Sequence, residues 1–353
     1  MSQTRRPAGI VLVLLADWLG SLAAAEPGPC AGSERTVAMA TKALDRGDSA
    51  KAGPLLEGLA TSHADCAGVI IGLARLRAAK GDPAEAERLF DRAVALAPDD
   101  AVVHAHAAEF WLTRGRPARA DHLAALALSL NPDCAEALVV QGRILSQRGP
   151  PDAAREALEK AVRLQPESAE AHYQLGAWLY RRLLHAEAAE HFEKAAALRP
   201  SDARALGHLA LSVERLGEAE RADVAYRDAL KVNDGAFRDP FLDYYYGRFL
   251  LKQGRLEESS RHLDRAVSLH PDERSVYYER AKLKLELQEY EAARQDAERA
   301  RGLRDPGGTV IDLQVYYLLA TVYARLGDND QARKYAELSR TTPIPDQAAD
   351  RPR

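Results

Sequence analysis

Histidine, cysteine and acidic side chains are the groups of this 353-residue chain that could do chemistry, and the ten histidines are the first to consider. The histidines closest together are His104 with His106 and His185 with His191. Residues two apart on a helix face different directions, so the first pair cannot chelate one ion, and the second pair has no matching third ligand. No glycine-rich phosphate loop, nucleophile elbow or cysteine pair at zinc spacing occurs. We therefore predict no enzyme activity, no catalytic or metal-binding residue and no cofactor.

A regular spacing of prolines indicates the elements that must position any functional side chain. Pro98, Pro132, Pro166 and Pro200 follow one another at intervals of 34 residues. A fixed period of this length is typical of a stack of helical hairpins. Each proline ends the second helix of a hairpin, because it cannot continue that helix. The function of such a stack is expected on its surface rather than in one catalytic pocket.

Counting back from the prolines predicts nine hairpins, which we call units 1 to 9. Glycines fall between the two helices of most units, where a left-handed residue is expected to end the first helix. Two insertions, Phe237–Asp239 and Gly308–Asp312, interrupt the period, and we expect the first of them to bend the path of the stack. The nine units begin at Ser33, Ala67, Ala101, Ala135, Ala169, Ala203, Pro240, Arg274 and Leu313.

Within the units, the sequence resembles the tetratricopeptide repeat family. Unit 5 contains Leu175-Gly176, Ala188, Phe192 and Pro200, at the leucine-glycine, alanine, phenylalanine and proline positions of that family. The resemblance covers residues 33–340. It implies an all-α fold, a right-handed superhelical solenoid of about nine antiparallel helix-turn-helix hairpins, and a role as a protein interaction scaffold.

Small residues recur at one position of each first helix, where we expect the two helices of a unit to approach closely. A larger side chain there would push the helix axes apart. The residues at this position are Ala74, Ala108, Gly142, Gly176, Ala210, Gly247, Ala281 and Ala320.

The same resemblance implies a concave groove lined by the second, fifth, ninth, twelfth and thirteenth positions of each unit. Tyrosine gives broad contact at small entropic cost and arginine gives forked hydrogen bonds, so the two together suit an extended or helical peptide of acidic character. In the alternative interpretation the tyrosines pack between neighbouring first helices and the charges form a solvated face. The candidate partner-binding residues are Tyr173, Tyr180, Arg181, Arg215, Tyr244, Arg248, Lys252, Tyr278, Lys282, Tyr317 and Arg325.

Two functions fit such a stack. We favour a scaffold that binds a protein or peptide partner in the concave groove, and the alternative is a structural subunit of an envelope, secretion or polysaccharide-export complex. The net charge is only −4, with both signs interspersed along every unit. Bulk electrostatics therefore predict no nucleic-acid partner.

The cysteines suggest a disulfide at the first unit. Cys30 precedes the first helix and Cys66 ends unit 1, so both belong at the same end of an antiparallel hairpin, where a bond is geometrically possible. Cys134 lies two units further along, too far from Cys66 to pair with it. The alternative is three unpaired small residues in turns.

The two termini differ in composition from the units. Arg5-Arg6, a short apolar stretch and Ala23-Ala24-Ala25 form the layout of a secretory signal peptide cleaved after Ala25. We therefore predict a signal peptide at 1–25, a linker at 26–32 and a periplasmic or secreted protein of bacterial type. The apolar stretch is too short for a permanent membrane span, although an uncleaved segment that tethers the protein to a membrane is the alternative. The proline-containing tail, 341–353, is expected to be disordered.

Overall fold

The computed structural model describes residues 29–305 and 308–343, and this part of the chain contains eighteen α-helices and no strand. The helices pair into nine antiparallel hairpins. The first helices of the hairpins are α1 (Glu34–Asp45), α3 (Ala67–Ala79), α5 (Ala101–Thr113), α7 (Ala135–Arg148), α9 (Ala169–Arg181), α11 (Ala203–Arg215), α13 (Leu242–Lys252), α15 (Arg274–Glu286) and α17 (Asp312–Leu326). The second helices are α2 (Ser49–Leu59), α4 (Pro83–Leu96), α6 (Pro117–Leu130), α8 (Pro151–Leu164), α10 (His185–Leu198), α12 (Ala219–Lys231), α14 (Leu256–Leu269), α16 (Tyr290–Gly302) and α18 (Asn329–Thr341).

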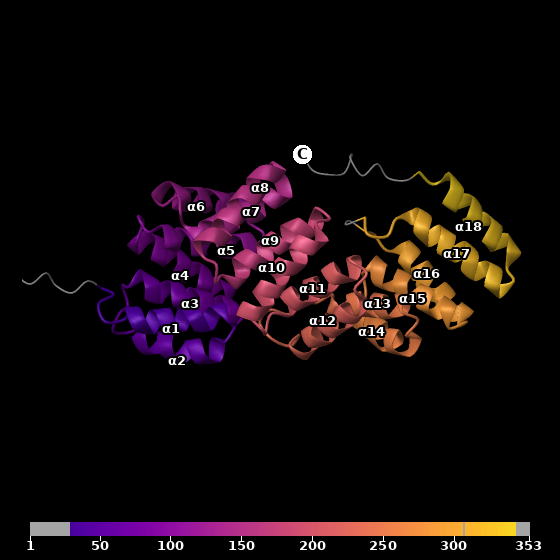
Figure 1. Ribbon diagram of the computed structural model, residues 1–353, viewed down its shortest axis with the longest axis horizontal. Helices are drawn as coiled ribbons and strands as arrows, with labels where there is room; N and C mark the ends of the chain where they lie inside the picture. Colours follow the sequence, from indigo (N-terminus) through magenta and orange to yellow (C-terminus); the bar gives the residue numbers. More distant parts are fainter. Residues whose placement is uncertain (1–28, 306–307, 344–353) are drawn as a thin grey trace, which may run out of the picture.

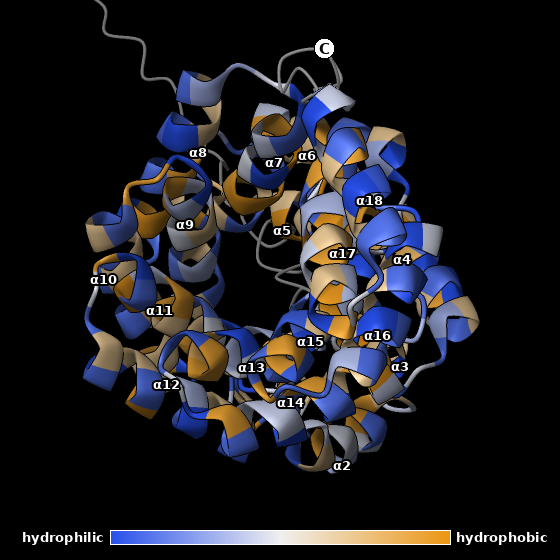
Figure 2. Ribbon diagram, turned by 90° about the vertical axis from the view of Figure 1, so that its right-hand side faces the viewer, coloured by the Kyte–Doolittle hydropathy of each residue, from blue (hydrophilic) through white to orange (hydrophobic). Residues whose placement is uncertain are grey.

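The hairpins follow one another along the long axis of the molecule, from α1 and α2 at one end to α17 and α18 at the other (Figure 1). Viewed along that axis, the first helices from α5 to α17 lie nearer the centre of a superhelix than the second helices that follow them (Figure 2). Each first helix packs on its own second helix and on the first helix of the next hairpin. The prediction of an all-α superhelical solenoid is confirmed.

Local sequence signals begin and end these helices. Side chains of Asp100 and Asp202 accept backbone N–H bonds at the starts of α5 and α11, which satisfies groups that have no partner within the helix. Proline occupies the first position of α4, where its missing N–H costs nothing. Pro98 and Pro200 lie two residues beyond the ends of α4 and α10. The 34-residue spacing therefore corresponds to the physical length of one hairpin.

The close crossing of the two helices in a unit is confirmed. A Cβ atom added at Gly142 would lie 2.5 Å from the Cγ atom of Leu158 on the partner helix. At Gly247 the corresponding distance, to Leu263, is 2.8 Å. Ala74 occupies the same position in unit 2 and is fully buried. Only glycine or alanine fits where the paired helices meet.

The left-handed turn between the helices persists even where glycine is replaced. Leu183 and Gln288 stand at turn positions and adopt φ angles of 63° and 61°. The prediction fails at Gly149, whose φ is −105°. Pro150 and Pro151 follow Gly149, and a residue before proline is restricted to extended conformations. For that reason α7 continues to Arg148 and ends without a left-handed residue.

The insertion between units 6 and 7 reaches back to unit 1. A Cβ atom at Gly47, in the turn of unit 1, would lie 2.9 Å from the ring of Phe237 and 3.1 Å from the Cβ atom of Ala236. The hydroxyl of Ser201 also donates to the backbone oxygen of Arg46, at 3.2 Å. We call these interactions the closing contact. Where the sequence predicted only a bend, the insertion joins the ends of the first superhelical turn, which comprises units 1 to 6.

At the N-terminal end, a disulfide links Cys30 to Cys66, with 4.8 Å between the two Cα atoms. Cys134 is buried and free. The predicted signal peptide, the first residues of the linker and residues 344–353 of the tail lie outside the described residues. The solenoid ends at Thr341, one residue beyond its predicted end. None of the described helices combines the length and the apolar character needed to cross a membrane.

Candidate partner-binding face

The inner face of the superhelix is the side formed by the odd-numbered helices, and all eleven predicted binding residues lie on these helices (Figure 2). Two of the tyrosines are structural. Tyr244 is only 5% exposed, and Tyr173 packs edge-on against His208 of the next first helix, with 5.5 Å between ring centroids. The guanidinium of Arg204 covers the Tyr173 ring at 4.6 Å. Burial raises the pKa of both tyrosines. Both rings therefore pack between helices, as the alternative interpretation of the tyrosines expects.

Three of the predicted cations hold carboxylates of the chain itself. Lys252 lies 2.7 Å from Glu214, and Arg248 lies 3.6 Å from the same carboxylate. Burial alone would raise the pKa of Glu214, but the hydrogen bond from Lys252 and the charge of Arg248 lower it. Lys282 is paired with Glu279 at 2.8 Å. These cations connect or brace helices and are not available to a partner without breaking those pairs.

Arg181 and Arg215 differ from the paired cations. Each is exposed at the last residue of its helix, α9 and α11, and neither lies within 4 Å of a carboxylate in the part of the chain that the structure describes. Tyr180, which precedes Arg181 in the sequence, is half-buried, and its ring centroid lies 5.1 Å from that of His185. Burial, followed by the charge of Arg215, lowers the pKa of His185. We call Tyr180, Arg181 and Arg215 the arginine patch.

The remaining predicted residues lie further along the stack. Tyr278 is half-buried, with the Lys282 ammonium 5.4 Å above its ring. Tyr317 is 68% exposed on α17, and Arg325 is exposed near the end of the same helix. The eleven residues thus do not form one continuous site. They divide into structural residues, the arginine patch and a group at the C-terminal end of the solenoid.

A charged series on the inner face of units 2 to 4 was missed by the sequence analysis. Arg75, Glu109 and Arg143 occupy the ninth position of three successive units and alternate in sign. Arg75 lies 2.5 Å from Asp45, and Arg143 lies 3.8 Å from Glu109. The alternation can be read from the sequence, because the ninth positions of units 2, 3 and 4 are arginine, glutamate and arginine in turn.

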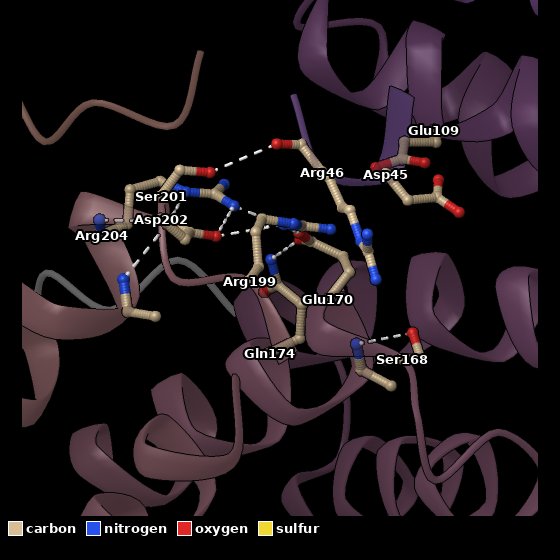
Figure 3. A network of polar contacts seen from close by, with 12 residues as sticks. Asp45, Arg46, Glu109, Ser168, Glu170, Gln174, Arg199, Ser201, Asp202 and Arg204 are labelled. Atoms are coloured by element: carbon tan, nitrogen blue, oxygen red, sulfur yellow. Dashed lines mark hydrogen bonds and ion pairs between the residues drawn. The ribbon is translucent and has the colours of Figure 1, made fainter. Parts of the chain in front are cut away.

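The charged series continues into a buried network beside the closing contact (Figure 3). Arg199 lies 3.1 Å from Asp202, and Arg204 lies 3.2 Å from Glu170. Gln174 donates to Glu170 at 2.7 Å. Burial alone would raise the pKa of Glu170, but Arg204, the Gln174 amide and Arg199 lower it to about 2. The carboxylates of this network pair with arginines of the chain itself, so apart from Arg181 and Arg215 the inner face here offers mainly charges that are already paired.

Two buried histidines have a structural role. His104 and His172 are each 2% exposed, and their Nε2 atoms bond the backbone oxygens of the preceding closing prolines, Pro98 and Pro166, at 2.7 and 3.1 Å. The Nδ1 atom of His172 also lies 2.9 Å from that of His191. Within the described ranges, no group of three or more histidine, cysteine or acidic side chains is placed to hold a metal ion.

Comparison with known families identifies the class of protein. Models described as tetratricopeptide repeat match residues 43–109, 139–203, 246–309 and 313–339. The chain therefore belongs to the tetratricopeptide repeat family. No curated protein matches its sequence.

Solved structures share the fold at low sequence identity. The human IFIT1 dimer with PPP-AAAA superimposes with a TM-score of 0.54 at 20% identity, over 83% of this chain and 68% of IFIT1. A monomeric IFIT1 mutant with Gppp-AAAA superimposes with a TM-score of 0.54 at 19% identity, over 84% of this chain and 68% of that chain. PilF of Pseudomonas aeruginosa superimposes with a TM-score of 0.38 at 19% identity, over 69% of this chain and 92% of PilF. The IFIT1 superpositions support the solenoid fold alone, and the PilF score is too low to carry an argument.

Proposed function

We propose that this protein is a scaffold that binds an acidic segment of a protein partner at the arginine patch. One observation carries the proposal: Arg181 and Arg215 are exposed on the inner face without a carboxylate partner among the described residues, whereas Arg248, Lys252 and Lys282 are paired. A guanidinium offers forked hydrogen bonds that match a carboxylate. The ring of Tyr180, the residue before Arg181, adds a partly exposed aromatic surface.

The electrostatics of the patch favour an anionic ligand. Arg181 is exposed at the end of α9, but the neighbouring protein displaces part of the water around its guanidinium, and this desolvation lowers the pKa of Arg181. A charge in such surroundings interacts more strongly with an incoming carboxylate than a fully solvated one does. The cost of partial desolvation is present before binding, so an acidic partner would offset it rather than add to it.

We also propose that the protein works outside the reducing cytoplasm, in the periplasm or as a secreted protein. The Cys30–Cys66 disulfide supports this location, because such bonds persist in oxidising compartments. The signal-like sequence at 1–25 supports it independently. Fractionation of cells that express the full chain tests the proposal, and an N-terminus sequenced at Glu26 is expected. A protein that retains residues 1–25 in the membrane fraction would favour the tethered alternative.

The binding proposal is tested with a fluorescent twelve-residue peptide rich in glutamate and tyrosine, measured by anisotropy. The double variant Arg181→Glu/Arg215→Glu is expected to weaken binding at least tenfold. The matched control, Arg163→Glu/Arg261→Glu, makes the same change in net charge on the outer helices α8 and α14 and is expected to stay within twofold of the unmodified protein.

Two results would contradict the binding proposal. Equal losses in the patch and control variants would mean that the peptide senses only overall charge. Tighter binding of a single-stranded oligoadenylate RNA than of the peptide, lost in the Arg181→Glu/Arg215→Glu variant, would make the patch a nucleic-acid site instead.

A further inference from the structure

The C-terminal end of the solenoid carries a depression that the proposed function does not use. It lies between α17 and α18 and encloses about 810 Å³. Its floor consists of small residues, Ala320, Ala324, Ala332 and Ala336, and Tyr317 stands beside them. No helix among the described residues follows α18 to cover it, and α17 and α18 form the end of the stack (Figure 1). We call this depression the end seat.

Unit 8 shows what fits such a depression. The residues that correspond to the end seat there, 39 positions earlier, are Tyr278, Ala281, Leu285, Ala293 and Ala297, so the seat differs from unit 8 in having Ala324 in place of a leucine. They pack in one hydrophobic cluster with α17, which contributes Val315, Leu318, Leu319 and Val322. These four α17 residues are spaced as i, i+3, i+4 and i+7, the pattern of one helix face. The end seat therefore has the composition of a surface that receives the first helix of a further hairpin.

The rim of the end seat is basic, which restricts its occupant. Arg325, Arg333 and Arg340 all line the depression, and no acidic residue does. Arg325 and Arg340 form no ion pair within the described ranges, and the one ion pair of Arg333, with Asp330 at 3.5 Å, is exposed to solvent. Arginines also stand at the positions of Arg333 and Arg340 in unit 8, but there Arg294 pairs with Glu291 and Arg301 with Glu298, and Glu286 replaces Arg325. The rim of the end seat therefore differs from unit 8 in the loss of Glu286 and in the weaker pairing of its arginines.

We propose that the end seat binds an amphipathic helix of a partner protein, with aliphatic residues at i, i+3, i+4 and i+7 and acidic residues on both flanks. The apolar stripe would replace the one that α17 presents to unit 8, and the acidic flanks would pair with the three arginines. A second copy packed face to face would place arginine against arginine and is disfavoured. The proposal does not depend on the arginine patch, which lies in units 5 and 6, three to four units before the end seat.

The test uses two synthetic twenty-residue helices that share the aliphatic stripe and differ only in their flanks, glutamate in one and lysine in the other. Anisotropy with the full chain is expected to show at least tenfold tighter binding of the glutamate peptide. The variant Arg325→Glu/Arg333→Glu/Arg340→Glu is expected to reverse that preference. Filling the floor with Ala336→Tyr is expected to weaken both peptides at least tenfold. Hydrogen exchange should show protection of α17 and α18 on peptide addition.

The outer-face variant Arg163→Glu/Arg261→Glu serves as the control for added negative charge and is expected to bind the glutamate helix normally. Protection of α17 and α18 distinguishes binding at the end seat from binding at the arginine patch, so failure here is distinguishable from failure of the proposed function. Three results would overturn the end-seat proposal. The first is equal affinity for the two peptides, and the second is unchanged binding in Ala336→Tyr. The third is no binding of the glutamate helix to the full chain. Binding regained on deletion of residues 344–353 would then assign the seat to that segment, and a dimer abolished by Ala336→Tyr would assign it to a second copy.

Discussion

Units 1 to 6 and units 7 to 9 are built from the same hairpin but present different surfaces. In units 1 to 6 the closing contact joins the insertion to unit 1, and most charges of the inner face pair with one another, as Arg204 does with Glu170, apart from Arg181 and Arg215. Units 7 to 9 lie beyond that contact and end in a seat with a basic rim that no helix among the described residues covers. The difference shows that the repeat supplies the scaffold, while residues that break the repeat decide where a partner can bind.

The helix crossings are alike in both regions. Gly142 in unit 4 and Gly247 in unit 7 leave the same small space for a leucine of the partner helix. The contrast therefore arises from surface and insertion residues rather than from the core. We therefore expect that units 1 to 6, which the closing contact joins into one turn, can be destabilised independently of units 7 to 9.

The largest expected effect is loss of the disulfide in unit 1. The bond closes a loop with a sequence separation of 36, for which the chain-entropy model gives about 3–4 kcal/mol of stabilisation. The variant Cys66→Ala should lose this amount, measured by hydrogen exchange of α1 and α2. The matched control is Cys134→Ala, at the same position of unit 3, where the cysteine is equally buried but free. Equal losses in both variants would show that packing alone matters at this position.

A second prediction separates the closing contact from backbone strain. Gly47 and Gly81 have φ angles of +75° and +80°, so leucine at either costs about 1–2 kcal/mol of backbone strain. Only Gly47 has a neighbour, Phe237, within 4 Å, and Gly47→Leu should cost about 1–3 kcal/mol more by overpacking. Urea unfolding should show the difference, and small-angle scattering should show expansion for Gly47→Leu alone. Identical behaviour of the two variants would mean that the closing contact contributes nothing.

A third prediction uses pH, because the histidines with lowered pKa lie in units 3 to 6. Burial, followed by the charge of Arg75, lowers the pKa of His106 to about 3, and burial with His172 lowers that of His191 to about 4. Each histidine is protonated only in the unfolded chain between its folded pKa and about 6.5. Their contribution to stability is therefore present above pH 6.5 and is lost as the pH falls.

Between pH 7 and pH 5.5 the loss should reach up to about 1 kcal/mol for each histidine. Hydrogen exchange should show α5 to α11 opening first as the pH falls. The double variant His106→Gln/His191→Gln should flatten the pH dependence of these helices. An unchanged pH dependence in that variant would exclude the two histidines as its source.

The smallest expected effect is a gain in stability at a turn of unit 5. Leu183 adopts a left-handed φ of 63° and is 75% exposed, so its side chain contributes little packing. Leu183→Gly should remove the strain and stabilise the protein by about 0.5–1 kcal/mol after the entropic cost of glycine. Thermal unfolding measures this gain, with Gly217→Leu as the reciprocal control at the next turn. A loss in Leu183→Gly would show that the leucine packs more than its exposure suggests.

Much of the fold could be predicted from the sequence, because a repeat imposes the same local geometry many times. The helices α3, α5, α7, α9 and α11 begin at the first residue of their predicted units. The site could be predicted only in part. Fifth-position tyrosines lie where successive first helices meet, so Tyr173 and Tyr244 are packed while Tyr317, which no later helix of the described residues covers, is exposed. Position within a unit could not reveal which rings a neighbour would cover.

The sequence by itself determined the hairpin, its period and its crossings, because prolines, turn glycines and small residues act within one unit or on its immediate neighbour. Only the tertiary structure decided that Phe237 meets Gly47 and that Ser201 meets Arg46. Such contacts depend on the curvature accumulated over the first superhelical turn, and a small rotation at each junction changes which distant residues meet. The structure was also needed to separate the paired cations from the exposed arginines, because the 34-residue period does not fix which carboxylate each side chain meets.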